Sequence, residues 1–117
     1  MSAFCVFGVS RIDCRRKAER KVSRWIENEK RLLTPAEYSR EVDKVADEIF
    51  IASTRAIQIS PTFDAPQFCL DWQAIAESGG HIKAASLHVR DVKRDDEGKP
   101  LLRNGNTIAT WRPYTEQ

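Results

Sequence analysis

The chain has few of the residues that build metal sites or disulfide frameworks. It contains three cysteines and two histidines in 117 residues, and the cysteines show no CxxC or CxxH spacing. His81 and His88 lie seven residues apart, an odd offset that would put them on opposite faces of a regular strand. The sequence therefore predicts no metal site and no cofactor. An odd number of unspaced cysteines favours the reducing cytoplasm over a secreted, disulfide-bonded protein.

Long hydrophobic runs and phosphate-binding loops are also missing. No apolar stretch approaches the roughly 20 residues that a membrane-spanning helix needs. The short apolar run 3–9 is followed, not preceded, by positive charges, unlike a signal peptide. Neither GxxxxGK[ST] nor GxGxxG occurs. These absences argue against a membrane partner and against nucleotide-dependent chemistry.

The composition is that of a globular chain with little net charge. It is 41% hydrophobic and 31% charged, with a formal net charge of +2, so the whole molecule exerts no strong field on nucleic acid or membrane. A chain of this length is expected to bury a real core without metal or disulfide support. We therefore expect residues 1–117 to form a single domain.

Local signals in the first half predict a strand and two helices. The continuous apolar run 3–9 favours a strand buried on both faces. Ser10 is placed to cap a helix over 11–31. The segment 34–37, Thr-Pro-Ala-Glu, combines a threonine cap, a proline for the first turn and a glutamate that reaches back to the cap. It predicts a second helix over 36–52, which would form an antiparallel αα-hairpin with the first.

The second half predicts one more helix and a small number of strands. Residues 55–60 are a short strand candidate, and whether they join the sheet is left open. Asp64 is placed to cap a third helix that Gly79-Gly80 would end. Residues 82–92 alternate apolar and polar side chains, as a strand with one solvated face does. Asn104-Gly105 predicts a hairpin turn, with 107–111 as the returning strand that Pro113 would stop.

Together these elements predict an α+β fold. A small, mainly antiparallel sheet, made of the N-terminal strand and the C-terminal hairpin, would pack against the αα-hairpin and the third helix. Strand order and oligomeric state stay open, and a homodimer is compatible with the sequence.

The most informative segment is the helix over 11–31, because its basic side chains gather on one face. Residues 11–31 hold nine lysines and arginines against four acids, whereas 34–52 hold two against five. The face could therefore bind a partner, or it could only pair with the acidic helix 36–52. At about 100° per residue, five basic residues fall in one arc, opposite an apolar side. They are Lys17, Arg20, Lys21, Arg24 and Arg31.

Direct binding of DNA or RNA is one functional interpretation. The basic face could contact phosphates, and further cations, including Lys99 and Arg103, surround the C-terminal hairpin. Trp111 and Tyr114 beside Arg112 could stack on a base. No helix-turn-helix, RNP or zinc-finger pattern supports this interpretation.

Cysteine catalysis is the other chemical alternative. Cys14 would lie in the first turn of a helix between Arg11 and Arg15, where amides and cations favour a thiolate. No base or oxyanion site accompanies it, and it falls on the apolar side of its helix. A buried structural cysteine is the simpler interpretation.

We therefore expect a binding protein that is not an enzyme. Its expected partner is a protein or ribonucleoprotein complex, and it would act as a stoichiometric inhibitor or adaptor of a nucleic-acid-processing complex. Small anti-CRISPR and anti-restriction proteins of phages and plasmids offer an analogy in size and in their lack of a catalytic set, without a shared motif. The expected contacts are Lys17, Arg20, Lys21, Arg24 and Arg31 on the helix, with Lys99 and Arg103 at the hairpin.

Overall fold

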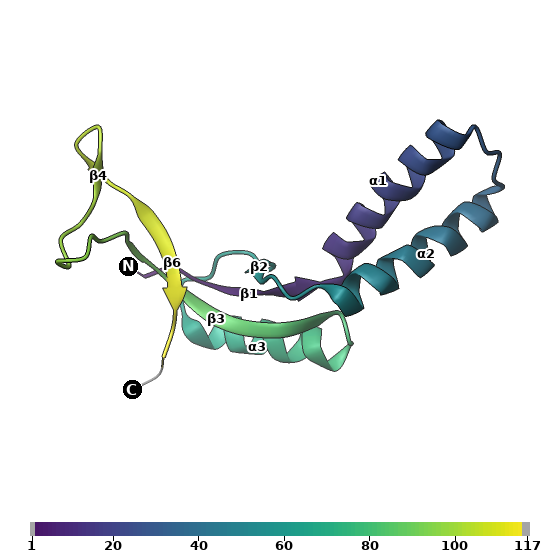
Figure 1. Ribbon diagram of the computed structural model, residues 1–117. Helices are drawn as coiled ribbons and strands as arrows, with labels where there is room; N and C mark the ends of the chain where they lie inside the picture. The colour runs from purple at the N-terminus through teal and green to yellow at the C-terminus, as the bar shows by residue number, and fades with distance from the viewer. Residues whose placement is uncertain (1, 116–117) are drawn as a thin grey trace.

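The computed structural model, which describes residues 2–115, folds into three helices and two antiparallel sheets (Figure 1). The larger sheet has the order β2-β1-β3-β6, and β4 pairs with β5 in the smaller one. The predicted α+β fold is confirmed. The strands are β1 (Phe4–Ser10), β2 (Ile57–Gln58), β3 (Ile82–Val92), β4 (Leu102–Arg103), β5 (Asn106–Thr107) and β6 (Ala109–Pro113).

The two central strands, β1 and β3, are antiparallel, and their backbones come unusually close together at one point. Their register runs from Phe4 opposite Val89 to Ser10 opposite Ile82, with an irregularity at Gly8. A Cβ at Gly8 would lie 3.0 Å from the carbonyl oxygen of Lys83. Glycine therefore lets the strands approach at the bulge. The candidate strand at 55–60 does join the sheet, because β2 pairs with β1 at Phe7 and Gly8.

Helix α3 (Pro66–Ser78) covers one face of the larger sheet (Figure 1). Its Cys69 is buried in a core cluster with Phe4, Val6 and Val89. The predicted cap at Asp64 is wrong: the N-cap residue is Ala65, which offers no side-chain hydrogen bond. Pro66 occupies the first helical turn and keeps the residue before it extended, so Asp64 lies one position too early to cap the helix.

Helices α1 (Arg11–Glu29) and α2 (Pro35–Ala52) form the predicted αα-hairpin. The hydroxyl of Ser10 accepts a hydrogen bond from the Asp13 amide at 3.2 Å. Thr34 and Glu37 form the predicted capping box at the start of α2. The first helix ends two residues earlier than predicted, because Lys30 adopts a left-handed conformation with φ of 51°.

The αα-hairpin has its own core and projects away from the sheet (Figure 1). Ala18, Val22 and Val42 are at most 2% exposed and hold the two helices together. Phe50 joins the base of this hairpin to the sheet by packing with Val9 and Cys14. The radius of gyration is 18.8 Å, against roughly 13 Å for a compact domain of this length.

The C-terminal hairpin differs from its predicted form. Asn104 and Gly105 have φ values of 54° and 82°, as the predicted two-residue turn requires. The turn joins β4 to β5, and the strand that returns to β3 is β6, which starts only at Ala109. The prediction of 107–111 as the returning strand is therefore wrong in its bounds. Pro113 is the last residue of β6, so the strand stops where predicted. As part of an edge strand, its missing amide is tolerated.

Candidate binding surface

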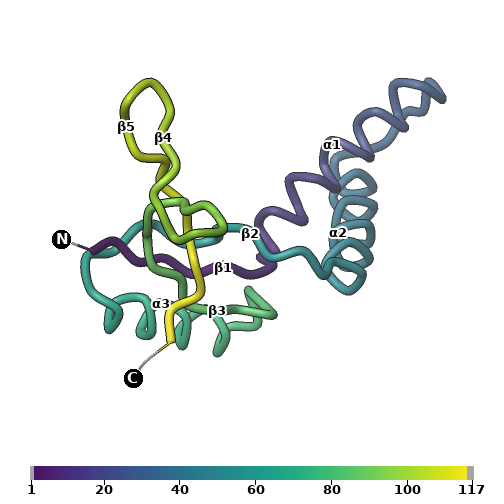
Figure 2. The backbone as a smooth tube through the Cα atoms, turned by 60° about the vertical axis from the view of Figure 1, so that its left-hand side comes forward, coloured from purple at the N-terminus to yellow at the C-terminus, as the bar shows by residue number. Residues whose placement is uncertain are grey.

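Four exposed cations form a row along α1. None of them lies within 4.0 Å of a carboxylate oxygen in the part of the chain that the structure describes. Figures 1 and 2 both show α1 on the side of the αα-hairpin that is nearer to β4 and β5. We name this set the basic row: Lys17, Arg20, Lys21 and Arg24.

The two helices do exchange charge, but through other residues. Arg11 lies 3.1 Å from Asp47, and Arg15 forms a hydrogen-bonded ion pair with Asp43. The hydrogen bond to Asp43 raises the pKa of Arg15 above its ordinary value. Asp43 and Asp47 of α2 therefore pair with Arg15 and Arg11 on one flank of α1. The ion pairs of the described residues do not involve the basic row, whose charge stays available for a partner.

Arg31, the fifth predicted contact, lies apart from the basic row. It follows the end of α1, where its guanidinium is 3.2 Å from Glu29 and lies over the Trp25 ring at 4.7 Å. These local contacts fix Arg31 at the tip of the αα-hairpin. Its charge is already partly offset there.

Lys99 and Arg103 belong to a separate arm of the molecule. Arg103 is exposed in β4, and the Lys99 ammonium lies 3.7 Å from Glu97. In Figures 1 and 2 the β4–β5 hairpin and the αα-hairpin rise at opposite ends of one sheet face, while α3 covers the other face. The structure does not bring these two residues together with the basic row.

The predicted stacking group around Trp111 is divided between the two faces of the sheet. Tyr114 packs edge-on against Phe4 at 5.4 Å, on the face that α3 covers. Arg112 lies 2.7 Å from Asp91. The pKa of the Asp91 carboxyl is lowered mainly by a hydrogen bond from the Val92 amide and next by the hydrogen bond from Arg112. Neither residue can act together with Trp111: Arg112, its neighbour in β6, points to the opposite face, and Tyr114 packs on that same face beyond the end of the strand.

On the opposite face Trp111 has other neighbours, which the sequence did not single out. Its ring lies 6.4 Å from Phe7, and the Arg90 guanidinium is 5.5 Å from its centroid. Phe7 stacks on His88 with ring centroids 4.1 Å apart. The alternation in 82–92 placed His88 and Arg90 on the solvated side of β3. Only the register with β1 adds Phe7 to them.

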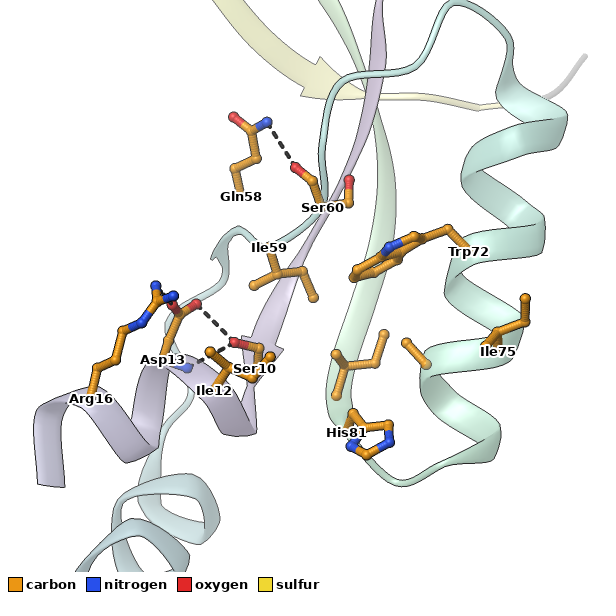
Figure 3. A pocket seen from close by; sticks show the side chains of 12 residues that line it. Ser10, Ile12, Asp13, Arg16, Gln58, Ile59, Ser60, Trp72, Ile75 and His81 are labelled. Carbon is orange, nitrogen blue, oxygen red and sulfur yellow. Dashed lines mark hydrogen bonds and ion pairs between the residues drawn. The ribbon is translucent and has the colours of Figure 1, made fainter. Parts of the chain in front are cut away.

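A cavity of about 630 Å³ lies between the start of α1 and α3 (Figure 3). Its walls are mainly apolar, with Trp72 and Ile75 from α3. Three of its polar side chains are paired with one another: Asp13 is hydrogen-bonded to Ser10 at 2.8 Å and lies 3.7 Å from Arg16. Ser10 caps α1, and the mainly apolar walls of the cavity offer a docking place for apolar groups.

All three cysteines are buried, and this weakens the case for a cysteine nucleophile. Cys5 and Cys69 are 0% exposed and Cys14 is 2% exposed. Burial raises the pKa of Cys5 to about 11, with a smaller contribution from Cys69. Burial also raises the pKa of Cys69. Cys14 packs with Val9 and Phe50, as the apolar side of its helix predicts.

No three metal-ligating side chains converge within residues 2–115. His81 lies in the turn before β3 and lines the cavity, whereas His88 lies on the sheet face with Phe7. The same described residues contain no helix that is both long and apolar enough to cross a bilayer.

Comparison with known proteins does not assign this chain to a family. No protein-family model, curated protein or solved structure matches this chain. The functional argument therefore depends on the basic row, the sheet face around Trp111 and the shape of the molecule.

Proposed function

We propose that this protein is a non-catalytic binding protein that acts stoichiometrically as an adaptor or inhibitor of a nucleic-acid-processing complex. The basic row on α1 is its principal contact. The observation that carries the proposal is that Lys17, Arg20, Lys21 and Arg24 stay exposed, while Asp43 and Asp47 of α2 pair with Arg15 and Arg11 instead.

The form of the αα-hairpin supports this role. It projects from the sheet and joins it only at its base, so the outer side of α1 can approach a large partner without a clash from the rest of the chain (Figure 2). Exposed cations on such an arm attract phosphates or acidic surfaces and raise the association rate. A nucleic-acid-processing complex presents both kinds of negative surface.

Charge reversal of the basic row tests the proposal. We expect Arg20→Glu/Arg24→Glu to reduce recovery of the partner complex about tenfold, because two attractive charges become repulsive. The melting temperature should change little, since both side chains are exposed and form no ion pair within the described chain. The measurement is affinity capture of the tagged protein from extract of the cells that make it, quantified by mass spectrometry and paired with thermal melts.

A matched control lies on the other helix of the same hairpin. Arg40 and Lys44 are exposed on α2, so Arg40→Glu/Lys44→Glu changes the net charge equally without touching the basic row. This variant should recover the complex as the unmodified protein does. Equal recovery by both double variants, or a matching loss of recovery and of melting temperature for Arg20→Glu/Arg24→Glu, would show that the basic row is not the contact.

A further inference from the structure

Among residues 2–115, no helix covers the second face of the larger sheet (Figures 1 and 2). Helix α3 packs on the face that carries Phe4, Val6 and Val89, and Figures 1 and 2 show no helix across the middle of the other. Strand pairing places alternate residues of the four strands on this second face. We call it the open sheet face and define it by Phe7, Gln58, Ser86, His88, Arg90 and Trp111.

Three flat rings lie together on the open sheet face. Phe7 and His88 are stacked at 4.1 Å with an interplanar angle of 23°, and Trp111 lies 6.4 Å from Phe7. All three are only partly buried. Such rings are hydrophobic surface that remains in contact with water, and further flat rings can cover them by stacking.

The charge on this face has one sign. Arg90 is exposed beside Trp111, and none of the six residues that define the face is acidic. Asp91, the next residue along β3, points to the opposite face and is held there by Arg112 at 2.7 Å. Helix α1, which carries the basic row, rises at one end of the same face (Figures 1 and 2). The surface is therefore complementary to a polyanion that also carries flat rings.

Unpaired nucleobases on a phosphate backbone meet both requirements. Aromatic side chains stack on bases of any sequence, and cations beside them contact the phosphates. A duplex fits less well, because its base faces are already stacked on one another. We propose that the open sheet face binds single-stranded nucleic acid, with bases stacked on Trp111 and on the Phe7–His88 pair. Arg90 and the basic row contact its phosphates. This inference rests on the proposed function, since it names a ligand for the same basic row.

The test is fluorescence anisotropy at low salt with labelled oligo(dT) and oligo(U) of about 12 nucleotides, and with a blunt duplex of equal length. Trp111→Ala should weaken binding of the single strands by at least about fivefold, whereas Trp111→Phe, which keeps a ring, should retain most of the affinity. If Trp111→Ala does not fold, the same affinity measurement is made on His88→Ala, which should also bind the single strands more weakly. Tighter binding of oligo(U) than of oligo(dT) would indicate RNA as the natural ligand, and the reverse would indicate DNA.

A matched control is available on the opposite side of the molecule. Phe68 is an aromatic residue of α3 that is 55% exposed, so Phe68→Ala removes a ring away from the open sheet face and should leave binding unchanged. Unaltered affinity of both folded variants, Trp111→Ala and His88→Ala, or equal affinity for the duplex, would overturn the inference.

The two proposals fail in different ways. The single-strand inference alone is wrong if the oligonucleotides do not bind, yet Arg20→Glu/Arg24→Glu still loses the partner complex. The proposed function alone is wrong if Trp111→Ala loses oligonucleotide binding, while the charge-reversed variant recovers the complex normally.

Discussion

Replacement of Phe50 by alanine is expected to lower the free energy of unfolding by about 3 kcal/mol. Phe50 is 8% exposed and packs with Val9 of the sheet and Cys14 of α1. The Arg11 guanidinium also lies 4.2 Å from its ring centroid. The truncation would leave a cavity at the point where the αα-hairpin joins the sheet. Urea unfolding followed by circular dichroism measures the change.

The next residue supplies the control for this prediction. Ile51 is 77% exposed, so Ile51→Ala should change the free energy of unfolding by less than about 0.5 kcal/mol. Equal effects of the two substitutions would mean that Phe50 does not hold the hairpin to the sheet.

The three thiols are expected to react very slowly with iodoacetamide in the folded protein. A pKa of about 11 in place of 9.0 for Cys5 lowers its thiolate fraction near pH 8 by about a hundredfold. Burial adds a steric barrier for all three cysteines. Modification in denaturant should therefore be faster by at least about a hundredfold, as mass spectrometry over time would show. Rapid modification of native Cys14 alone would restore the cysteine-enzyme interpretation.

The raised thiol pKa also predicts a dependence of stability on alkaline pH. The folded state favours the neutral Cys5 thiol, so this stabilisation is complete below the ordinary pKa of 9.0 and is lost as the pH rises toward about 11. Over that interval Cys5 contributes a fall in the free energy of unfolding of up to about 1.4 kcal/mol per pH unit. A Cys5→Ala variant should show a shallower fall, and identical slopes would contradict the assignment.

Much of the fold could be predicted because its signals are local. The capping box of Thr34 and Glu37 fixes the start of α2 within a few residues of sequence. The Asn104-Gly105 pair specifies a turn with two positive φ angles. The apolar side of α1 is a property of helical periodicity alone, and its residues Cys14, Ala18 and Val22 are buried in the structure.

The candidate site was harder to predict because it depends on relations between elements. Which cations of α1 stay available depends on the rotation of α1 against α2, which directs Arg11 and Arg15 toward the acids of α2. The neighbours of Trp111 depend on the register between β6 and β3, which places it opposite Arg90. Nearness in sequence suggested Arg112 and Tyr114 instead, but Arg112 points to the opposite face as the next residue of the strand, and Tyr114 packs against Phe4 on that face.

The most direct test of the basic row is the salt dependence of binding to labelled oligo(dT), compared between the unmodified protein and Arg20→Glu/Arg24→Glu. Five phosphate contacts, four by the basic row and one by Arg90, predict a log–log slope of about −3.5, since each contributes about 0.7 on a single strand. Loss of two contacts should make the slope shallower by about 1.4. Equal slopes for the two proteins, or no dependence on salt, would contradict the assignment of the basic row as a phosphate-binding surface.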